Sequence, residues 1–226
     1  MTTPALAAAA AERAQHIRQR ADRPSQRRSA EQAGARAAVR AALSGVQVRE
    51  SGDGGGTLEF LGHASVYERA YEMWDMFGPY TEIVSEGAGG DSLARADLDV
   101  PLVLGHDQLR RMARTTTGTL FLVEDATGLS VRAPALDPAD HDVAYIAPKL
   151  KAGLIDEMSF AFRIESGQWS PDYTEYRINR YDIHRGDVAI VGYGANPATT
   201  ATMRQPAAAA PATSRARALL EIALAR

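Results

Sequence analysis

Three residues of the types that cooperate in nucleophilic catalysis lie far apart in this chain of 226 residues. Ser159 stands in the segment 157–162, His106 follows an apolar stretch, and Asp187 precedes the apolar run 188–191. A serine hydroxyl becomes a nucleophile when a histidine accepts its proton and an acid orients the imidazole ring. Because the chain has no cysteine to supply a thiol, these residues predict a serine-hydrolase site that the fold must assemble.

Each of these residues also has an ordinary structural explanation when it is taken alone. A strand serine can bond a neighbouring carbonyl, a histidine after a strand can belong to a turn, and an acid before a strand can cap backbone groups. The prediction therefore depends on the combination of all three beside expected strands of one domain. If Asp187 does not hold the third role, Asp182 or Asp107 is the next candidate.

The elements that must position these residues are mainly strands. Period-two alternation and short apolar runs, bounded by glycine, proline and aspartate, predict strands at residues 57–67, 80–84, 99–104, 119–124, 129–133, 157–165, 174–179 and 183–191. Helices are expected at 91–95 and at 137–152, although Pro148 interrupts the second pattern. Many strands with few helices favour a mainly β fold with some α, either a barrel or a sandwich decorated by helices.

Composition divides the chain into three parts, residues 1–56, 57–200 and 201–226. The middle part holds nearly all aromatic and β-branched residues and is long enough to bury one core. The first part is an Ala/Arg-rich arm, helical or disordered, with helices expected at about 5–20 and 30–43, followed by a glycine-rich linker. The last part is typical of an Ala/Pro linker and a short helix from Ser214, which Ser214 would cap.

The net charge of −3 gives no reason to expect a specific nucleic-acid partner. The arginines of the arm form a basic run that is either a solvated surface or a contact for an acidic partner. No apolar stretch is long enough to span a membrane. The apolar run 5–11 is followed, not preceded, by charged residues, so we do not expect a signal peptide. The absence of cysteine is compatible with a reducing compartment.

Five segments of the middle part resemble those of the HK97-like prohead proteases of tailed bacteriophages, which are capsid-maturation serine peptidases. The most specific is Met158-Ser159-Phe160-Ala161-Phe162, where that family usually has Met-Ser-Phe-Gly-Phe. Residues 103–107 resemble its histidine segment, usually Asn-His-Asp, and 187–191 with 195–197 resemble its closing strand. Residues 61–67 and 83–88 resemble its opening strand and a turn before a short helix. Four positions depart from the family pattern: Gly105 replaces Asn, Ala161 replaces Gly, and Ser85 and Gly194 replace Pro.

The resemblance implies a β-barrel ringed by a few helices, like the herpesvirus assembly proteases, with helical N- and C-terminal tails. It implies a serine endopeptidase with Ser159 as nucleophile, His106 as general base and Asp187 as the orienting acid. The substrates would be the scaffolding region of the major capsid protein, any separate scaffold, and the protease itself. Residues 45–56 and 198–213 are then candidate self-cleavage sites. The enzyme would act inside the procapsid in the bacterial host cytoplasm, with an oligomer possible there, and without a cofactor or a metal.

The group that stabilises the oxyanion and two alternative functions have still to be considered. The sequence does not reveal the group that stabilises the oxyanion; a backbone N–H is one candidate, and Arg163 or Arg185 is another. A non-enzymatic capsid scaffold or assembly protein is the main alternative function. A metal-dependent hydrolase would have to use His63, His106, His141 and His184, but no pair has the His-Glu-Xaa-Xaa-His spacing typical of such enzymes.

Overall fold

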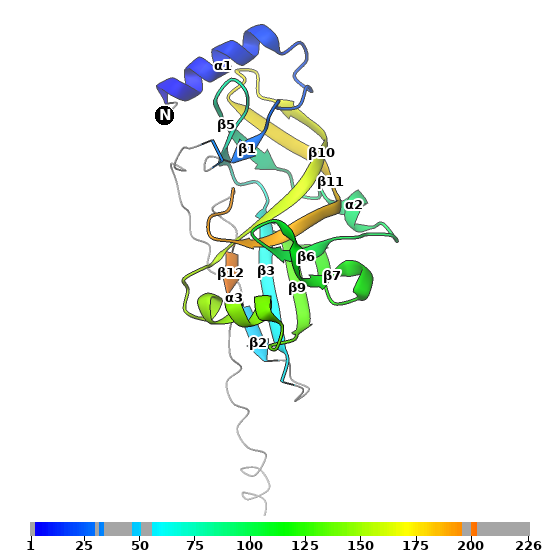
Figure 1. The fold of residues 1–226 in the computed structure, drawn as a ribbon. Coiled ribbons are helices and arrows are strands. Elements are labelled where there is room, and N and C mark those ends of the chain that lie inside the picture. The colour runs from blue at the N-terminus through cyan, green and yellow to red at the C-terminus, as the bar shows by residue number, and fades with distance from the viewer. Residues whose placement is uncertain (1–2, 30–31, 34–46, 51–55, 196–199, 203–226) are drawn as a thin grey trace, which may run out of the picture.

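The computed structural model describes residues 3–29, 32–33, 47–50, 56–195 and 200–202 of the chain. These residues form two β-sheets with short helices at their margins (Figure 1). The larger sheet comprises β1 (Arg28–Ser29), β4 (Tyr71–Trp74), β5 (Pro79–Val84), β6 (Pro101–Leu104), β7 (Asp107–Arg114), β10 (Glu157–Trp169) and β11 (Glu175–Val191). Its order is β1-β4-β5-β11-β6-β7, and β10 pairs with the other edge of β11.

The smaller sheet comprises β2 (Gln47–Glu50), β3 (Leu58–Val66), β8 (Phe121–Glu124), β9 (Gly128–Leu136) and β12 (Thr200–Thr202). β3 lies in its centre and pairs antiparallel with β9, β2 and β12. Buried residues alternate along β3 as the period-two pattern predicts. The core cluster unites both sheets, since Phe60 and Leu129 of the smaller sheet belong to it together with Leu102 and Ile178 of the larger one.

Three helices flank these sheets in the described part of the chain: α1 (Pro4–His16), α2 (Gly90–Leu93) and α3 (His141–Lys151). A 3-10 turn, η1 (Thr115–Thr117), follows β7. Asp140 caps α3 by accepting from the backbone N–H groups of Asp142 and Val143. The helix thus begins after the expected Asp137, and it tolerates Pro148 in its last turns. Figure 1 shows α1 across one end of the larger sheet, beside β5, and α3 at the opposite end of the molecule.

Most expected strands are confirmed, with one important difference in the C-terminal half. Residues 174–179 and 183–191 were expected as two strands, but they form the single strand β11. Its backbone remains bonded across the expected break because the segment around α2 supplies partners: Tyr181 N–H donates to Ala88 O, and Ile183 N–H donates to Ser92 Oγ. β4 and β7 were not anticipated, and β2 lies where a linker was expected.

The expectation of a closed β-barrel is wrong for the described residues. They form two sheets, and the larger is mixed, with β11 parallel to β5 and β6 but antiparallel to β10. β1 and β7 terminate its strand order instead of pairing with one another. The mainly β character with few helices is confirmed, whereas the likeness to herpesvirus assembly proteases stays a prediction. The helices expected at 30–43 and from Ser214 lie almost wholly outside the described residues.

The described part of the N-terminal arm packs against the larger sheet. α1 contacts β5, and β1 adds to the sheet by pairing with β4, Arg28 opposite Trp74 and Ser29 opposite Met73. Trp169, which is fully buried, donates through Nε1 to Asp22 O and through its backbone N–H to Arg20 O. The division at residue 57 stays a prediction, but residues 3–29 share the core's packing and are not spatially separate from it.

Three arginines of the arm, seven residues apart, bond groups within the same molecule. Arg13 forms a bidentate ion pair with Asp75 at 2.8 and 3.0 Å, and both side chains are buried. Arg20 Nε donates to Trp169 O at 2.7 Å, and Arg27 forms a bidentate pair with Glu82 at 2.7 and 2.5 Å. These cations therefore neutralise or satisfy internal acceptors, and the basic run expected to be a solvated surface or a partner contact is in part a set of internal anchors.

Replacing Arg13 with alanine should strongly destabilise the protein. The substitution leaves the Asp75 carboxylate buried without its cation, a change that costs about 3–5 kcal/mol in buried pairs. Urea unfolding followed by circular dichroism measures the loss. Arg18→Ala, which removes an exposed arginine of the same arm, is the matched control and should leave the midpoint nearly unchanged. Equal midpoints for both variants would show that the Arg13–Asp75 pair does not stabilise the fold.

Candidate active site

β11 brings the three predicted residues together because it pairs with a different strand on each side. On one side β10 runs antiparallel, with Ser159 opposite Ala189 and Ala161 opposite Asp187. On the other side β6 runs parallel and ends at Leu104, two residues before His106. The serine, the acid and the histidine thus come from three adjacent strands of one sheet, although they lie far apart in the sequence.

A tight turn holds His106 at the tip of the β6–β7 hairpin. Leu104 pairs with Asp107, so the turn consists of Gly105 and His106, whose φ angles are 59° and 61°. Two central residues with positive φ are typical of a type I′ turn, whose twist matches that of paired strands. Glycine adopts such a φ without steric cost, and histidine tolerates it better than most residues. The same requirement explains why glycine can stand where the resembling proteases usually have asparagine.

His106 and Asp187 contact each other directly. The distance from His106 Nδ1 to Asp187 Oδ1 is 2.7 Å, and the Asp187 side chain is only 3% exposed, compared with 37% for His106. A carboxylate accepts only, so Nδ1 must carry the proton in this contact. In the neutral ring, Nε2 is then the unprotonated nitrogen and is available as a base.

Gln108 is a contact of the site that the sequence analysis missed. Its Nε2 donates to Asp187 Oδ2 at 2.6 Å, so each carboxylate oxygen has its own donor. Arg111 in turn donates to Gln108 Oε1 at 3.1 Å and to its backbone carbonyl at 2.7 Å. Only the position of Gln108, two residues after His106 on a hairpin, could have indicated this role, because alternate residues of a strand share a face.

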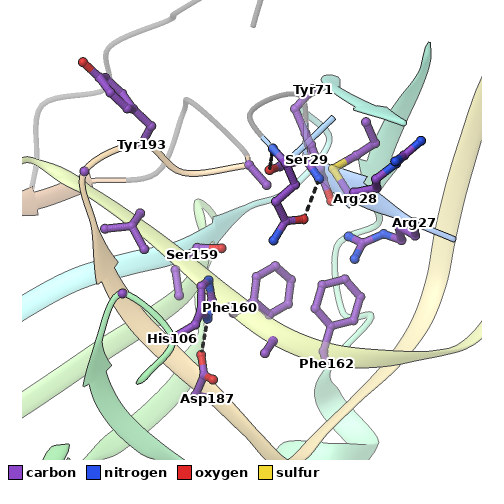
Figure 2. Close-up of a pocket in the computed structure, with 18 residues that line it drawn as sticks. Arg27, Arg28, Ser29, Tyr71, His106, Ser159, Phe160, Phe162, Asp187 and Tyr193 are labelled. Carbon is purple, nitrogen blue, oxygen red and sulfur yellow. Dashed lines mark hydrogen bonds and ion pairs between the residues drawn. The ribbon is translucent and has the colours of Figure 1, made fainter. Parts of the chain in front are cut away.

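Ser159 lines a cavity of about 670 Å³ together with His106 and Asp187. Figure 2 shows the Ser159 hydroxyl beside the His106 ring, with Asp187 on the far side of that ring. Among the contacts of the described residues, no hydrogen bond joins Ser159 Oγ to the imidazole. Such a contact is often long in a hydrolase without substrate and shortens when the substrate binds. The structure thus places the predicted nucleophile, base and orienting acid at one cavity.

The remaining cavity lining is largely apolar and aromatic. Phe160 and Phe162 stack with their ring centroids 4.1 Å apart, and both pack against Tyr181. Arg27 lies over the Phe162 ring at 4.8 Å, a favourable position for a cation. The complete lining is Arg27, Arg28, Ser29, Gln32, Ala64, Tyr71, Met73, Gly105, His106, Ser159, Phe160, Ala161, Phe162, Asp187, Val191, Gly192, Tyr193 and Ala195.

The alternative acids and the proposed arginine donors lie outside this cavity lining. Asp182 accepts from Arg163 Nη2 at 2.5 Å and from Ser92 Oγ at 2.8 Å. Burial would raise the pKa of Asp182, but these hydrogen bonds outweigh it and lower the pKa to about 2. Arg163 is therefore occupied by Asp182, and Arg185 and Asp107 are exposed side chains. None of the four lines the cavity that contains Ser159.

The other histidines lie apart from one another, and His63 and His184 have separate partners. His63 Nε2 contacts Asp125 Oδ2 at 2.8 Å, and His184 Nδ1 accepts from Asp99 N–H at 3.3 Å. Within the described ranges, no three His, Asp or Glu side chains gather as metal ligands. In the same ranges, no helix has the length and apolar character needed to cross a membrane.

A family model described as caudovirus prohead serine protease matches residues 44–212, which is well over half of the chain. The chain belongs to the caudovirus prohead serine protease family. It is therefore related to serine peptidases of phage capsid maturation, as the segments around His106 and Ser159 indicated. No curated protein and no solved structure was found to match the chain. The matched range contains all three candidate residues but excludes residues 3–29 and 32–33 of the arm.

Asp182 should make the stability of this family member depend on acid pH. Its folded pKa of about 2 lies below the value of about 3.9 expected for an unfolded chain. Its stabilisation is therefore complete above about pH 5 and decreases as the pH falls towards 2. Urea midpoints of the wild type and Asp182→Asn should differ most near neutral pH and converge in acid. Asp97→Asn, which removes a carboxylate from an exposed pair with Arg95, is the control and should show little difference at any pH.

Proposed function

We propose that this protein is a serine endopeptidase that cleaves the scaffolding region of the major capsid protein, and itself, during prohead maturation. The observation that carries this proposal is the cavity shared by Ser159, His106 and Asp187, with His106 bound through Nδ1 to the buried carboxylate. Membership of the prohead serine protease family supports the same reaction class.

In the proposed mechanism, Ser159 Oγ attacks the scissile carbonyl carbon while His106 Nε2 accepts the hydroxyl proton. Asp187 fixes the ring in the tautomer that leaves Nε2 free and stabilises the imidazolium that forms. The same imidazolium then protonates the leaving amine as the carbon–nitrogen bond breaks, which gives an acyl-enzyme on Ser159. Water deprotonated by Nε2 releases the acid product and regenerates the serine. Because Arg163 is bound to Asp182, backbone N–H groups are the better candidates for stabilising the oxyanion.

Substitutions in the proposed triad should follow the pattern of residues that act as one unit. Ser159→Ala and His106→Ala should each lower kcat by up to about 10⁶-fold, and the double variant should be little worse. Asp187→Asn should cost about 10⁴-fold, because the amide can no longer hold the useful tautomer. Proteolysis of unfolded casein measures kcat, and thermal unfolding verifies that each variant is folded. Additive losses in the double variant would contradict a concerted Ser159–His106 pair.

The capsid substrate is tested by co-expression with the capsid protein encoded beside this one. Wild-type enzyme should remove a discrete N-terminal fragment of the capsid protein, and Ser159→Ala should remove none, as intact mass spectrometry will show. The same spectra test the proposed self-cleavage, which predicts wild-type truncation within 45–56 or 198–213. Equal processing by wild type and Ser159→Ala would move the nucleophile elsewhere. No processing by either would favour the alternative of a non-enzymatic capsid scaffold or assembly protein.

A further inference from the structure

The cavity runs along one edge of β10, because four consecutive residues of this strand, Ser159 to Phe162, line it. Side chains of consecutive strand residues point to opposite faces, so a surface that touches all four must lie at the edge of the strand. Among the described residues β10 pairs only with β11, which leaves this edge without a strand partner. The Ala161 carbonyl lies against Gly186 of β11, so by alternation the backbone groups of Phe160 face the cavity.

The N-terminal segment forms the opposite side of the same cavity. Arg27, Arg28, Ser29 and Gln32 line it, and they come from β1 and its immediate surroundings. β1 is the terminal strand of the sheet and pairs only with β4 within the described ranges. The N–H of Ser29 bonds Gln32 Oε1, and the C=O of Ser29 accepts from Ala33 N–H, so these backbone groups are already occupied. Figure 2 shows Phe160 and Phe162 between Ser159 on one side and Arg27 on the other. Ser159 thus lies at one end of a cleft that has the edge of β10 on one side and residues of the N-terminal segment on the other.

Arg27 is anchored to the larger sheet by several contacts. Glu82 is fully buried and accepts from Arg27 through both carboxylate oxygens, and also from Tyr71 and Tyr80. Arg27 in turn covers the Phe162 ring. Gln32 Oε1 accepts from Ser29 N–H, and Ser29 Oγ accepts from Gln32 N–H, so these two residues bond each other reciprocally. These contacts anchor Arg27 to the larger sheet and join Ser29 to Gln32.

We propose that Arg27, Arg28, Ser29 and Gln32 form one wall of the substrate cleft, and that an extended peptide chain lies between them and the edge of β10 at residues 159–162 that faces away from β11. Such a peptide has unpaired N–H and C=O groups along its edges, which suit a cleft bordered by strands. The stacked rings of Phe160 and Phe162 would accept an apolar side chain of that peptide. The inference rests on the proposed endopeptidase activity. It assigns substrate binding to a part of the chain that precedes the family match at residue 44.

The absence of cysteine in this chain allows a direct test by single-site labelling. Ser29→Cys places one thiol on the proposed wall, and Ser25→Cys places one on an exposed position four residues earlier that does not line the cavity. Each variant is treated with a bulky maleimide. Two activities are then measured: hydrolysis of unfolded casein, which needs the whole cleft, and reaction of Ser159 with a small fluorophosphonate, which needs only the nucleophile.

Labelling at position 29 should lower kcat/KM for casein at least tenfold while the fluorophosphonate still reacts at a similar rate. Labelling at position 25 should change neither activity. If the thiol introduced at position 29 resists the maleimide, Ser29→Trp and Ser25→Trp provide the same comparison without a reagent. Equal casein hydrolysis by the two members of either pair would overturn the inference. Failure of the unlabelled protein to react with fluorophosphonate or to cut casein would instead overturn the proposed endopeptidase function.

A second pair of variants tests whether the stacked rings of Phe160 and Phe162 contribute to substrate recognition. Phe162→Ala should broaden the cleavage sites in casein by weakening the preference for an apolar residue at one fixed distance from the scissile bond. Phe121→Ala removes an exposed phenylalanine from β8 in the other sheet and should leave the cleavage map unchanged. Mass spectrometry of the casein fragments gives both maps. Identical cleavage maps for the two variants would show that Phe162 does not contribute to substrate recognition.

Discussion

β11 pairs with β10 along one edge and with β5 and then β6 along the other. Between its two parallel neighbours, its N–H groups bond the segment that links them: Tyr181 donates to Ala88, and Arg185 donates to Asp99. A strand in this position has no freedom to slide, because a shift of one residue would invert every side chain and unpair both edges. The position of Asp187 relative to Ser159 therefore follows from backbone pairing before any side chain of the site is considered.

Burial of Asp187 is the cost that this arrangement imposes on the fold. A carboxylate removed from water needs donors for its oxygens, since an uncompensated buried charge is strongly unfavourable. The β6–β7 hairpin supplies both donors, His106 from its turn and Gln108 from the start of its second strand. The same hairpin that completes the candidate site thus also satisfies the buried charge, and Arg111 holds Gln108 in place. The contacts that satisfy the buried carboxylate and those needed for the proposed chemistry thus come from one hairpin.

The sequence predicted the candidate residues better than the architecture that joins them. Ser159, His106 and Asp187 were chosen because all three lie beside apolar strands of one domain and match the family segments, and the structure places them at one cavity, while their roles stay a prediction. Gln108 gave no such signal, because its role appears only when β7 folds back beside β6. The prediction of a break near residue 180 was wrong for a similar reason. The polar residues Asn179 and Arg180 suggest a turn, and the segment around α2 that bonds the backbone there is distant in the sequence. Hydrophobic periodicity along the sequence does not show which distant segments pair with one another.

The arm shows the same limit in its charges. A run of arginines in an alanine-rich segment suggests a solvated surface because its acidic partners, Asp75 and Glu82, lie in another part of the chain. Because Arg13 and Arg27 are paired with these carboxylates, they do not indicate a solvated basic surface. Arginine suits this use, because its planar guanidinium bonds both oxygens of a carboxylate and stacks on aromatic rings, as Arg27 does on Glu82 and Phe162. Residues 27–29, which such contacts anchor beside Ser159, therefore help to shape the proposed cleft, although the family match begins only at residue 44.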